Sequence, residues 1–223
     1  MMAARFDVDA VLFDLDGTLL DTVDDLHEAA NRMLAELGRP LRTREEIRNF
    51  VGKGIPKLVE RCLADPDVSA ADFDAAVEVF RAHYRETNGS KSAPYDTVRE
   101  TLDALKASGV SMGVVTNKAQ DFAVPLLEAT GLADYFGAVV CGGMLPNKKP
   151  APDMLLHACE LLSVGKERAI MVGDSGNDAQ CAQAAGVPVL LMTYGYTEGV
   201  PVDTINCDGL LSKFAELPPL LGR

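Results

Sequence analysis

The chain has 223 residues, of which 48% are hydrophobic and 24% are charged, and its formal net charge at pH 7 is −12. A chain of this length forms one large domain, or one domain with a smaller insertion. The negative charge excludes nucleic acid and anionic membranes as expected partners, because both attract basic surfaces. An anionic substrate would therefore need local positive charge or a metal ion at its binding site.

The cysteines and the first residues indicate a cytoplasmic protein. There are five cysteines and no C-x-x-C pair, which predicts reduced thiols and not a disulfide framework. The stretch MMAARFDVDA lacks the apolar segment of a secretory signal, and no apolar run approaches the roughly 18 residues of a membrane span.

Short apolar runs alternate with amphipathic helical patterns along much of the chain. The runs that predict strands buried on both faces are residues 10–13, 110–115, 138–141, 169–172 and 187–192. Apolar residues share helix faces around 98–105, 122–127 and 154–162, and Pro125 should bend or shorten the second helix. The alternation predicts an α/β fold with a doubly wound, mostly parallel, Rossmann-like sheet. The last segment, LSKFAELPPLL, is expected to form a short closing helix.

A helical segment interrupts this alternation after the first strand. Its apolar spacing is helical throughout, as in DLHEAANRMLAELG and AADFDAAVEVFRAHYRE. Its second edge, NGSKSAP at residues 88–94, is rich in Gly, Ser and Pro, as a hinge or linker is. We therefore predict a catalytic α/β core of residues 1–20 and 93–223, and an all-helical cap of residues 21–92.

Polar and charged residues follow the predicted strands. The segments at these exits include DLDGT (14–18), TNK (116–118), NKKP (147–150) and GDSGND (173–178). Open parallel sheets bind ligands at the carboxyl ends of their strands, so these segments share one edge. If the first and fourth strands are neighbours, three or four carboxylates converge there. This layout is typical of an active site.

Converging carboxylates repel one another unless a cation lies between them. A hard divalent cation, Mg²⁺ above all, relieves that repulsion and also shares a phosphate oxygen. Thr116, Lys149 and the backbone amides around Leu15, Gly17 and Asn117 offer donors to a phosphate. One carboxylate can attack phosphorus to form an aspartyl phosphate. A second, two residues on, can protonate the leaving oxygen and then deprotonate the attacking water.

Further candidate residues bind substrate or support the site. Gly17 and Thr18 lie in the turn after the first strand, and Asn117 lies after the second. In the cap, Gly52-Lys53-Gly54 forms a loop whose cation could lower onto a substrate carboxylate, and a helix–helix turn without a binding role is the alternative. Aspartates 174 and 178 could instead cap the helix that starts near residue 175.

The segments DLDGTLLD, VVTN, KKPAP and VGDSGND resemble, in order, the four motifs of the haloacid dehalogenase superfamily of phosphatases. The helical insertion resembles the first cap type of that superfamily. The resemblance implies that Asp14 is the nucleophile and Asp16 the general acid/base, and that Thr116 and Lys149 bind phosphate. The implied Mg²⁺ ligands are Asp14, the main-chain carbonyl of Asp16, Asp174 and, in support, Asp178.

Within this superfamily, VGKGIPKLVERCL, VVTNKAQDFAVPLLEATGLADYF and LLMTYGY are similar to segments of bacterial phosphoglycolate phosphatases. That similarity implies 2-phosphoglycolate as the substrate. The likeness departs after Tyr196, where that family often continues with Asn-Tyr-Gly and this chain has Thr197-Glu198-Gly199. The departure lies near the mouth of the expected site, so it bears on the substrate more than on the reaction.

We therefore predict Mg²⁺-dependent hydrolysis of a small phosphorylated metabolite, first of all 2-phosphoglycolate, through an aspartyl phosphate. Alternatives within the enzyme class are a phosphatase for another small sugar or sugar-acid phosphate, a pyrophosphatase and a β-phosphoglucomutase. An alternative of another class is a phospho-accepting, receiver-like signalling module. Receivers, however, place the acceptor aspartate after a later strand and lack the helical insertion. The sequence leaves the oligomeric state open.

Overall fold

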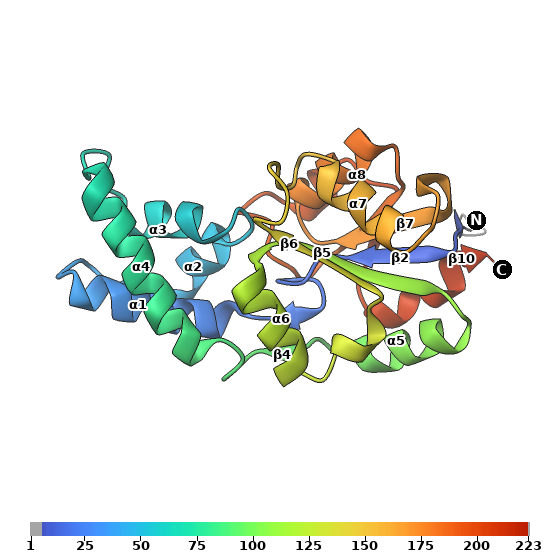
Figure 1. The fold of residues 1–223 in the computed structure, drawn as a ribbon, viewed down its shortest axis with the longest axis horizontal. Helices are drawn as coiled ribbons and strands as arrows, with labels where there is room; N and C mark the ends of the chain where they lie inside the picture. The colour runs from blue at the N-terminus through green and yellow to red at the C-terminus, as the bar shows by residue number, and fades with distance from the viewer. Residues whose placement is uncertain (1–5, 223) are drawn as a thin grey trace.

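The computed structural model describes residues 6–222 and consists of an α/β core with a group of four helices at one end (Figure 1). Residues 1–5 and 223 lie outside this range. The parts of the domain prediction and of the signal-segment prediction that fall on them therefore lie outside the described residues. Strands β1 (Phe6–Asp7) and β10 (Leu221–Gly222) lie at the end of the core that is farthest from the four helices.

A six-stranded sheet, parallel throughout, forms the centre of the core. Its spatial order is β6 (Ala138–Gly142), β5 (Ser111–Ala119), β2 (Ala10–Phe13), β7 (Ala169–Gly173), β8 (Val189–Met192) and β9 (Gly209–Leu211). The chain builds outward from β2 on one side and then returns to build outward on the other. This doubly wound order confirms the predicted fold class.

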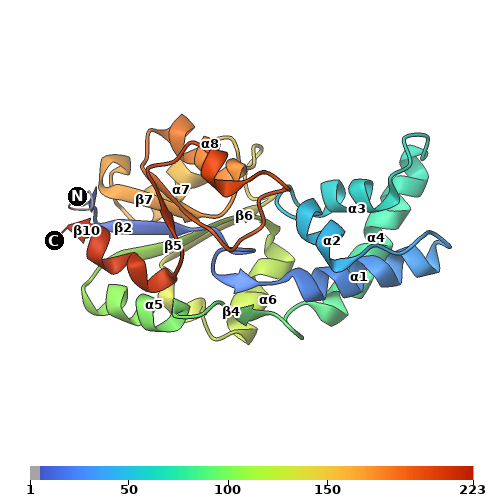
Figure 2. The same cartoon turned by 180° about the vertical axis from the view of Figure 1, so that it is seen from behind.

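Helices cover both faces of the sheet (Figures 1 and 2). On one face lie α5 (Val98–Ala107) and α6 (Gln120–Ala129), and on the other lie α7 (Asp153–Leu161) and α8 (Gly176–Ala185). Alternate residues of β2 serve the two cores: Val11 and Phe13 join the first, and Ala10 and Leu12 join the second. Burial on both faces is the reason that this strand is a continuous apolar run.

Two local predictions concern segments that contain proline, helix α6 and the closing segment of the chain. Helix α6 continues for four residues beyond Pro125, so the proline does not end it. The prediction of a closing helix in the last residues is wrong. The segment forms two short 3₁₀ turns, Phe214–Glu216 and Pro218–Leu220, before β10 pairs in parallel with β1. Two consecutive prolines remove backbone donors there, which prevents a regular α-helix.

The four helices outside the core pack around an apolar centre of their own. They are α1 (Val23–Glu36), α2 (Arg44–Phe50), α3 (Ile55–Leu63) and α4 (Ala70–Thr87). The chain leaves and re-enters the core at neighbouring points, because β3 (Leu20–Asp21) pairs with β4 (Ala93–Pro94) in antiparallel fashion. We refer to this helical group as the cap. Phe122 and Tyr196 of the core join the apolar centre of the cap, so the two parts are in contact.

Between residues 6 and 222, no helix combines the length and the apolar character that a membrane crossing requires.

Candidate active site

Carboxylates from two strand ends meet because β2 and β7 are neighbours. Phe13 lies opposite Val172 in the parallel register, so the residues that follow both strands emerge at the same edge. Carboxylate oxygens of Asp14, Asp174 and Asp178 lie within 4.8 Å of one another. The side chain of Asp14 is 13% exposed, whereas Asp174 and Asp178 are buried. These are three of the four predicted metal ligands.

The turn after β2 contains Asp14, and its residues Gly17 and Thr18 contact Asp174. Gly17 has a φ of +88°, and a Cβ at this position would lie 2.4 Å from Asp174 Oδ2. Only glycine meets both conditions without strain. The Thr18 hydroxyl donates a hydrogen bond to Asp174 Oδ1 at 2.8 Å. The structure thus places two predicted substrate-binding residues against a carboxylate of the cluster.

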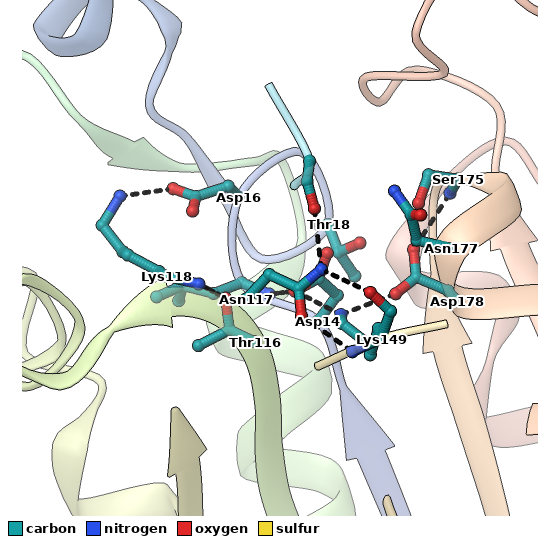
Figure 3. A network of polar contacts seen from close by, with 12 residues as sticks. Asp14, Asp16, Thr18, Thr116, Asn117, Lys118, Lys149, Ser175, Asn177 and Asp178 are labelled. Carbon is teal, nitrogen blue, oxygen red and sulfur yellow. Dashed lines mark hydrogen bonds and ion pairs between the residues drawn. The ribbon is translucent and has the colours of Figure 1, made fainter. Parts of the chain in front are cut away.

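Lys149 joins two carboxylates of the cluster (Figure 3). Its Nζ lies 2.8 Å from Asp14 Oδ1 and 2.7 Å from Asp178 Oδ1, and the residue is only 4% exposed. The second oxygen of Asp178 accepts hydrogen bonds from the amides of Asp174 and Ser175 and from the Ser175 hydroxyl. Asp178 therefore fixes both the lysine and the start of α8.

The electrostatics of this cluster favour a cation. Burial raises the pKa of Asp14 to about 7, against the attraction of Lys149 and with the repulsion of Asp178. Burial also raises the pKa of Asp174 well above its ordinary value, and the charges of Asp178 and Asp14 add to this effect. Burial acts to lower the pKa of Lys149, but Asp14 and Asp178 outweigh it and the pKa is raised. One ammonium contacts two of the three acidic groups, and oxygen ligands of this kind fit a hard divalent cation.

Asp16 points away from this cluster (Figure 3). Its Oδ1 accepts a hydrogen bond from Lys118 Nζ at 2.8 Å, and the same ammonium donates to Tyr84 Oη at 2.6 Å. Lys118 is 7% exposed. Lys118 belongs to a predicted strand exit, but no role was predicted for it. The available signal was a lysine at the end of an apolar strand, two residues after Thr116.

Asn117 links three segments of the site. Its Nδ2 donates to the carbonyl oxygens of Gly52 at 2.9 Å and Lys149 at 3.0 Å, and its Oδ1 accepts from the Lys149 amide at 3.0 Å. The neighbouring Thr116 is 1% exposed, and its hydroxyl accepts from the Lys118 amide at 3.1 Å. The side chain of Asn117 is therefore engaged in holding the cap loop and Lys149, and the residue lines the pocket together with Thr116.

Lys53 lies outside this pocket. Gly52 and Gly54 line it, whereas the Lys53 side chain is 45% exposed and its Nζ lies 3.4 Å from Glu198 Oε2. Arg61 of α3 pairs with the same oxygen of Glu198. The residue at which the chain departs from the expected Asn-Tyr-Gly pattern thus holds two cations of the cap.

A cavity of about 40 Å³ separates Asp14 from the cap. The cap contributes an apolar wall, and the core contributes carboxylates, Thr116, Asn117 and Lys118. The apolar residues of that wall are Leu26, Val51, Ile55 and Leu58. A small space between apolar side chains and a polar strand edge suits a small polar ligand that is shielded from water.

The fold and this site define a hydrolase with a doubly wound α/β core and a helical cap, and the comparisons agree. A model of the haloacid dehalogenase-like hydrolase family matches residues 11–192. The phosphoglycolate phosphatase of Thiobacillus denitrificans is 45% identical over 212 residues, which cover 94% of this chain and 93% of that protein. The phosphoglycolate phosphatase of Nitrosospira multiformis is 45% identical over 219 residues, covering 97% and 96%.

A solved structure described as a predicted phosphoglycolate phosphatase from Haemophilus somnus superposes with a TM-score of 0.89 at 31% identity. The superposition covers 94% of this chain and 96% of that one. The chain belongs to the haloacid dehalogenase-like hydrolase family. This confirms the predicted family.

Proposed function

We propose that this protein hydrolyses 2-phosphoglycolate to glycolate and phosphate through an aspartyl phosphate, with Mg²⁺ as its cofactor. The observation that carries the proposal is the arrangement around Asp14, where Lys149 and two further carboxylates gather at the edge of the sheet. The substrate is supported by two relatives, both phosphoglycolate phosphatases, that are 45% identical over almost the whole chain.

Asp14 is the proposed nucleophile. Its Oδ1 accepts from the Leu15 amide at 2.7 Å and lies 2.8 Å from Lys149 Nζ, so we assign the attack on phosphorus to Oδ2. The attack forms an O–P bond to Asp14 and breaks the P–O bond to glycolate. Lys149 stabilises charge on the phosphoryl oxygens as they transfer. The hydroxyl of Thr116 and the backbone amide of Asn117 are proposed further phosphate contacts.

Asp16 is the proposed general acid/base. It gives its proton to the leaving oxygen of glycolate in the first step. In the second step it takes a proton from the water that attacks the aspartyl phosphate, which releases phosphate and restores Asp14. The apolar wall of the cap keeps bulk water out of this exchange.

The carboxylates of Asp14 and Asp174, with the main-chain carbonyl of Asp16, would hold Mg²⁺, and Asp178 would support them. The ion would neutralise charge on the phosphoryl group during transfer. Gly17, Thr18 and Lys53 stay predictions as substrate-binding residues, because the first two hold Asp174 here and Lys53 pairs with Glu198. We also propose a cytoplasmic location, which the five free thiols support.

The test is phosphate release from a panel of phosphomonoesters, each with Mg²⁺ and with EDTA. The panel contains 2-phosphoglycolate, several sugar phosphates and pyrophosphate. We expect 2-phosphoglycolate to lead in kcat/KM by at least about tenfold, equivalent to about 1.4 kcal/mol. If another ester has the highest kcat/KM, the proposed substrate is wrong and the proposed reaction still stands. A stable phosphoprotein without multiple turnover would favour the receiver-like alternative.

A further inference from the structure

Lys118 is the only cationic side chain among the described residues that line the cavity between Asp14 and the cap. The cap side of this cavity is lined by apolar side chains, two glycines and the hydroxyl-bearing Tyr84, so it offers no cation to an anionic group. Lys149 is not among the residues that line this cavity, and its ammonium lies against Asp14 and Asp178. An anionic group of the substrate other than its phosphate would therefore meet Lys118 first.

The surroundings of Lys118 keep it charged and rigid. Burial acts to lower its pKa, but Asp16 and Tyr84 outweigh this effect and the pKa is raised. Its ammonium lies 5.0 Å from the centre of the Tyr84 ring, and that ring packs against Phe122 with centroids 4.7 Å apart. The ammonium carries three donors, and the recorded contacts to Asp16 and to Tyr84 use two of them.

The Tyr84 hydroxyl has a donor to spare. Its oxygen accepts the hydrogen bond from Lys118 at 2.6 Å, so its own proton is free to point elsewhere. Burial raises the pKa of Tyr84, so the hydroxyl keeps that proton at neutral pH. Lys118 and Tyr84 together offer a charged donor and a neutral donor side by side, which is the pair that a carboxylate with two oxygens accepts.

The spacing matches a short leaving group. The ester oxygen must lie within hydrogen-bond reach of Asp16, and Lys118 Nζ is 2.8 Å from an oxygen of Asp16. A carboxylate joined to the ester oxygen through one methylene would then lie beside Lys118. A water molecule needs roughly 10–15 Å³ of such a cavity. A volume of about 40 Å³ therefore accommodates the few atoms of a methylene carboxylate in this arrangement.

We propose that Lys118, assisted by the hydroxyl of Tyr84, binds the carboxylate of the substrate's leaving group. This contact selects phosphate esters in which the carboxylate is bonded directly to the ester carbon. The inference rests on the proposed phosphatase function and deepens it. It places the specificity-determining cation at the end of β5 in the core, and not on the Gly52-Lys53-Gly54 loop of the cap.

The experiment compares two esters that differ only in the group beyond the methylene. One is 2-phosphoglycolate, and the other is 2-hydroxyethyl phosphate, which has a neutral CH₂OH group in place of the carboxylate. The measured ratio is kcat/KM for 2-phosphoglycolate divided by kcat/KM for 2-hydroxyethyl phosphate. A charge-assisted hydrogen bond accounts for about 10- to 100-fold in such a ratio. We expect Lys118→Met to lower the ratio by this factor and Tyr84→Phe to lower it several-fold.

Two controls frame this result. Lys57→Met removes a cation of α3 that pairs with Glu60 and is 42% exposed, and it should leave the ratio unchanged. Lys118→Arg keeps the positive charge and should retain more of the ratio than Lys118→Met. Because Lys118 touches Asp16, both rates can fall together, and only the ratio reports on the carboxylate. Dissociation constants of both esters in the Asp14→Asn background, with and without Lys118→Met, give the same comparison without turnover.

The outcomes separate the inference from the proposed function. If the wild-type protein hydrolyses the two esters with equal kcat/KM, the proposed substrate and the inference are both wrong. A wild-type preference that persists in folded Lys118→Met would overturn the inference alone. A ratio that falls in Lys53→Met and not in Lys118→Met would assign the carboxylate to the cap loop. If Lys118→Met does not fold, Lys118→Arg and Tyr84→Phe decide the matter.

Discussion

Lys149 is the residue on which the charge balance of the site depends. Its ammonium contacts Asp14 and Asp178, whereas Asp174 receives hydrogen bonds from the Thr18 hydroxyl and the Tyr196 amide. One buried cation among three carboxylates leaves repulsion that burial strengthens. The raised pKa values of Asp14 and Asp174 express this imbalance.

Metal removal is expected to destabilise the protein more at pH 8 than at pH 5. The folded-state pKa values of Asp14 and Asp174 exceed the ordinary value of 3.8, so the folded protein holds more protons than the unfolded chain. The contribution of Asp14 to stability is therefore lost as pH rises from about 4 to about 7, and that of Asp174 is lost as pH rises through its own raised pKa. A cation bound by ionised carboxylates restores stability in the upper part of this range.

Thermal melting with Mg²⁺ or EDTA at both pH values measures the effect. At 100 times Kd the ion stabilises by about 2.7 kcal/mol, which raises Tm by roughly 5–10 °C in a chain of this size. We expect that shift at pH 8 and a much smaller one at pH 5. The Asp14→Asn variant should show a reduced shift. Equal shifts at both pH values would argue against these carboxylates as the ligands.

The Asp14→Asn variant should lose turnover while keeping its fold. The change removes the proposed nucleophile but preserves the size of the side chain, and it relieves repulsion among the buried carboxylates. We expect kcat to fall by at least about 10³-fold, with a melting temperature in EDTA at or above that of the wild type. Steady-state kinetics and thermal melting provide the test. Near-normal kcat in a folded variant would exclude Asp14 as the nucleophile.

The convergence of the candidate site was predictable where it depends on strand ends. Asp14, Asp174 and Lys149 follow apolar strands, and the rule that ligands bind at the carboxyl edge brings them together. Their catalytic roles stay predictions. Lys118 also lies at a strand end, but its contact with Asp16 and the contact of Glu198 with Arg61 were not predictable, because the partners are remote in sequence. Asp16 lies 102 residues from Lys118, and Arg61 lies 137 residues from Glu198.

At the scale of elements, Asp25 of α1 organises the segment by which the chain returns from the cap. Its buried carboxylate accepts hydrogen bonds from three backbone amides and two hydroxyls of residues 89–92. The composition of NGSKSAP is typical of a flexible linker. In the structure one helix side chain satisfies the polar groups of that segment, so the return strand has a defined path into β4.

Asp25→Ala is expected to lower the free energy of unfolding by at least about 3 kcal/mol, because it removes the buried acceptor of five hydrogen bonds. The matched control is Asp24→Ala, one residue away. The Asp24 side chain is 48% exposed and pairs with Arg44 at the surface, and such pairs contribute about 1 kcal/mol or less. Urea unfolding measures both variants. A loss in Asp25→Ala as small as that in Asp24→Ala would show that residues 89–92 do not depend on Asp25.

Elements were predictable to the extent that their residues are buried. The central strands are continuous apolar runs because both faces of the sheet are covered. The edge strand β9 has three residues, and β1 and β10 have two each, so no periodic pattern marks them. In the last segment Phe214 and Leu217 are buried as a helix would require, but Pro218 and Pro219 override that pattern.

At the scale of the whole molecule, polar contacts from one segment of the core hold the cap. The Arg48 guanidinium donates to the carbonyl oxygens of Tyr194 and Gly195 at 2.8 Å each, and Arg61 pairs with Glu198. These core residues follow β8, and Glu198 among them lies at the departure from the expected family pattern. Partly exposed polar contacts are weaker than an apolar interface, so they suit a cap that must open for substrate.

Glu198→Ala should therefore favour separation of the cap from the core. The change removes the shared partner of Arg61 and Lys53, and it also frees Asn177, whose Nδ2 donates to Glu198 at 2.8 Å. Loss of these contacts should speed amide hydrogen exchange in residues 51–54 about tenfold, while exchange in β2 stays unchanged. Glu60→Ala, which removes an exposed partner of Lys57 on α3, is the control. Equal exchange in both variants would show that the cap is held without Glu198.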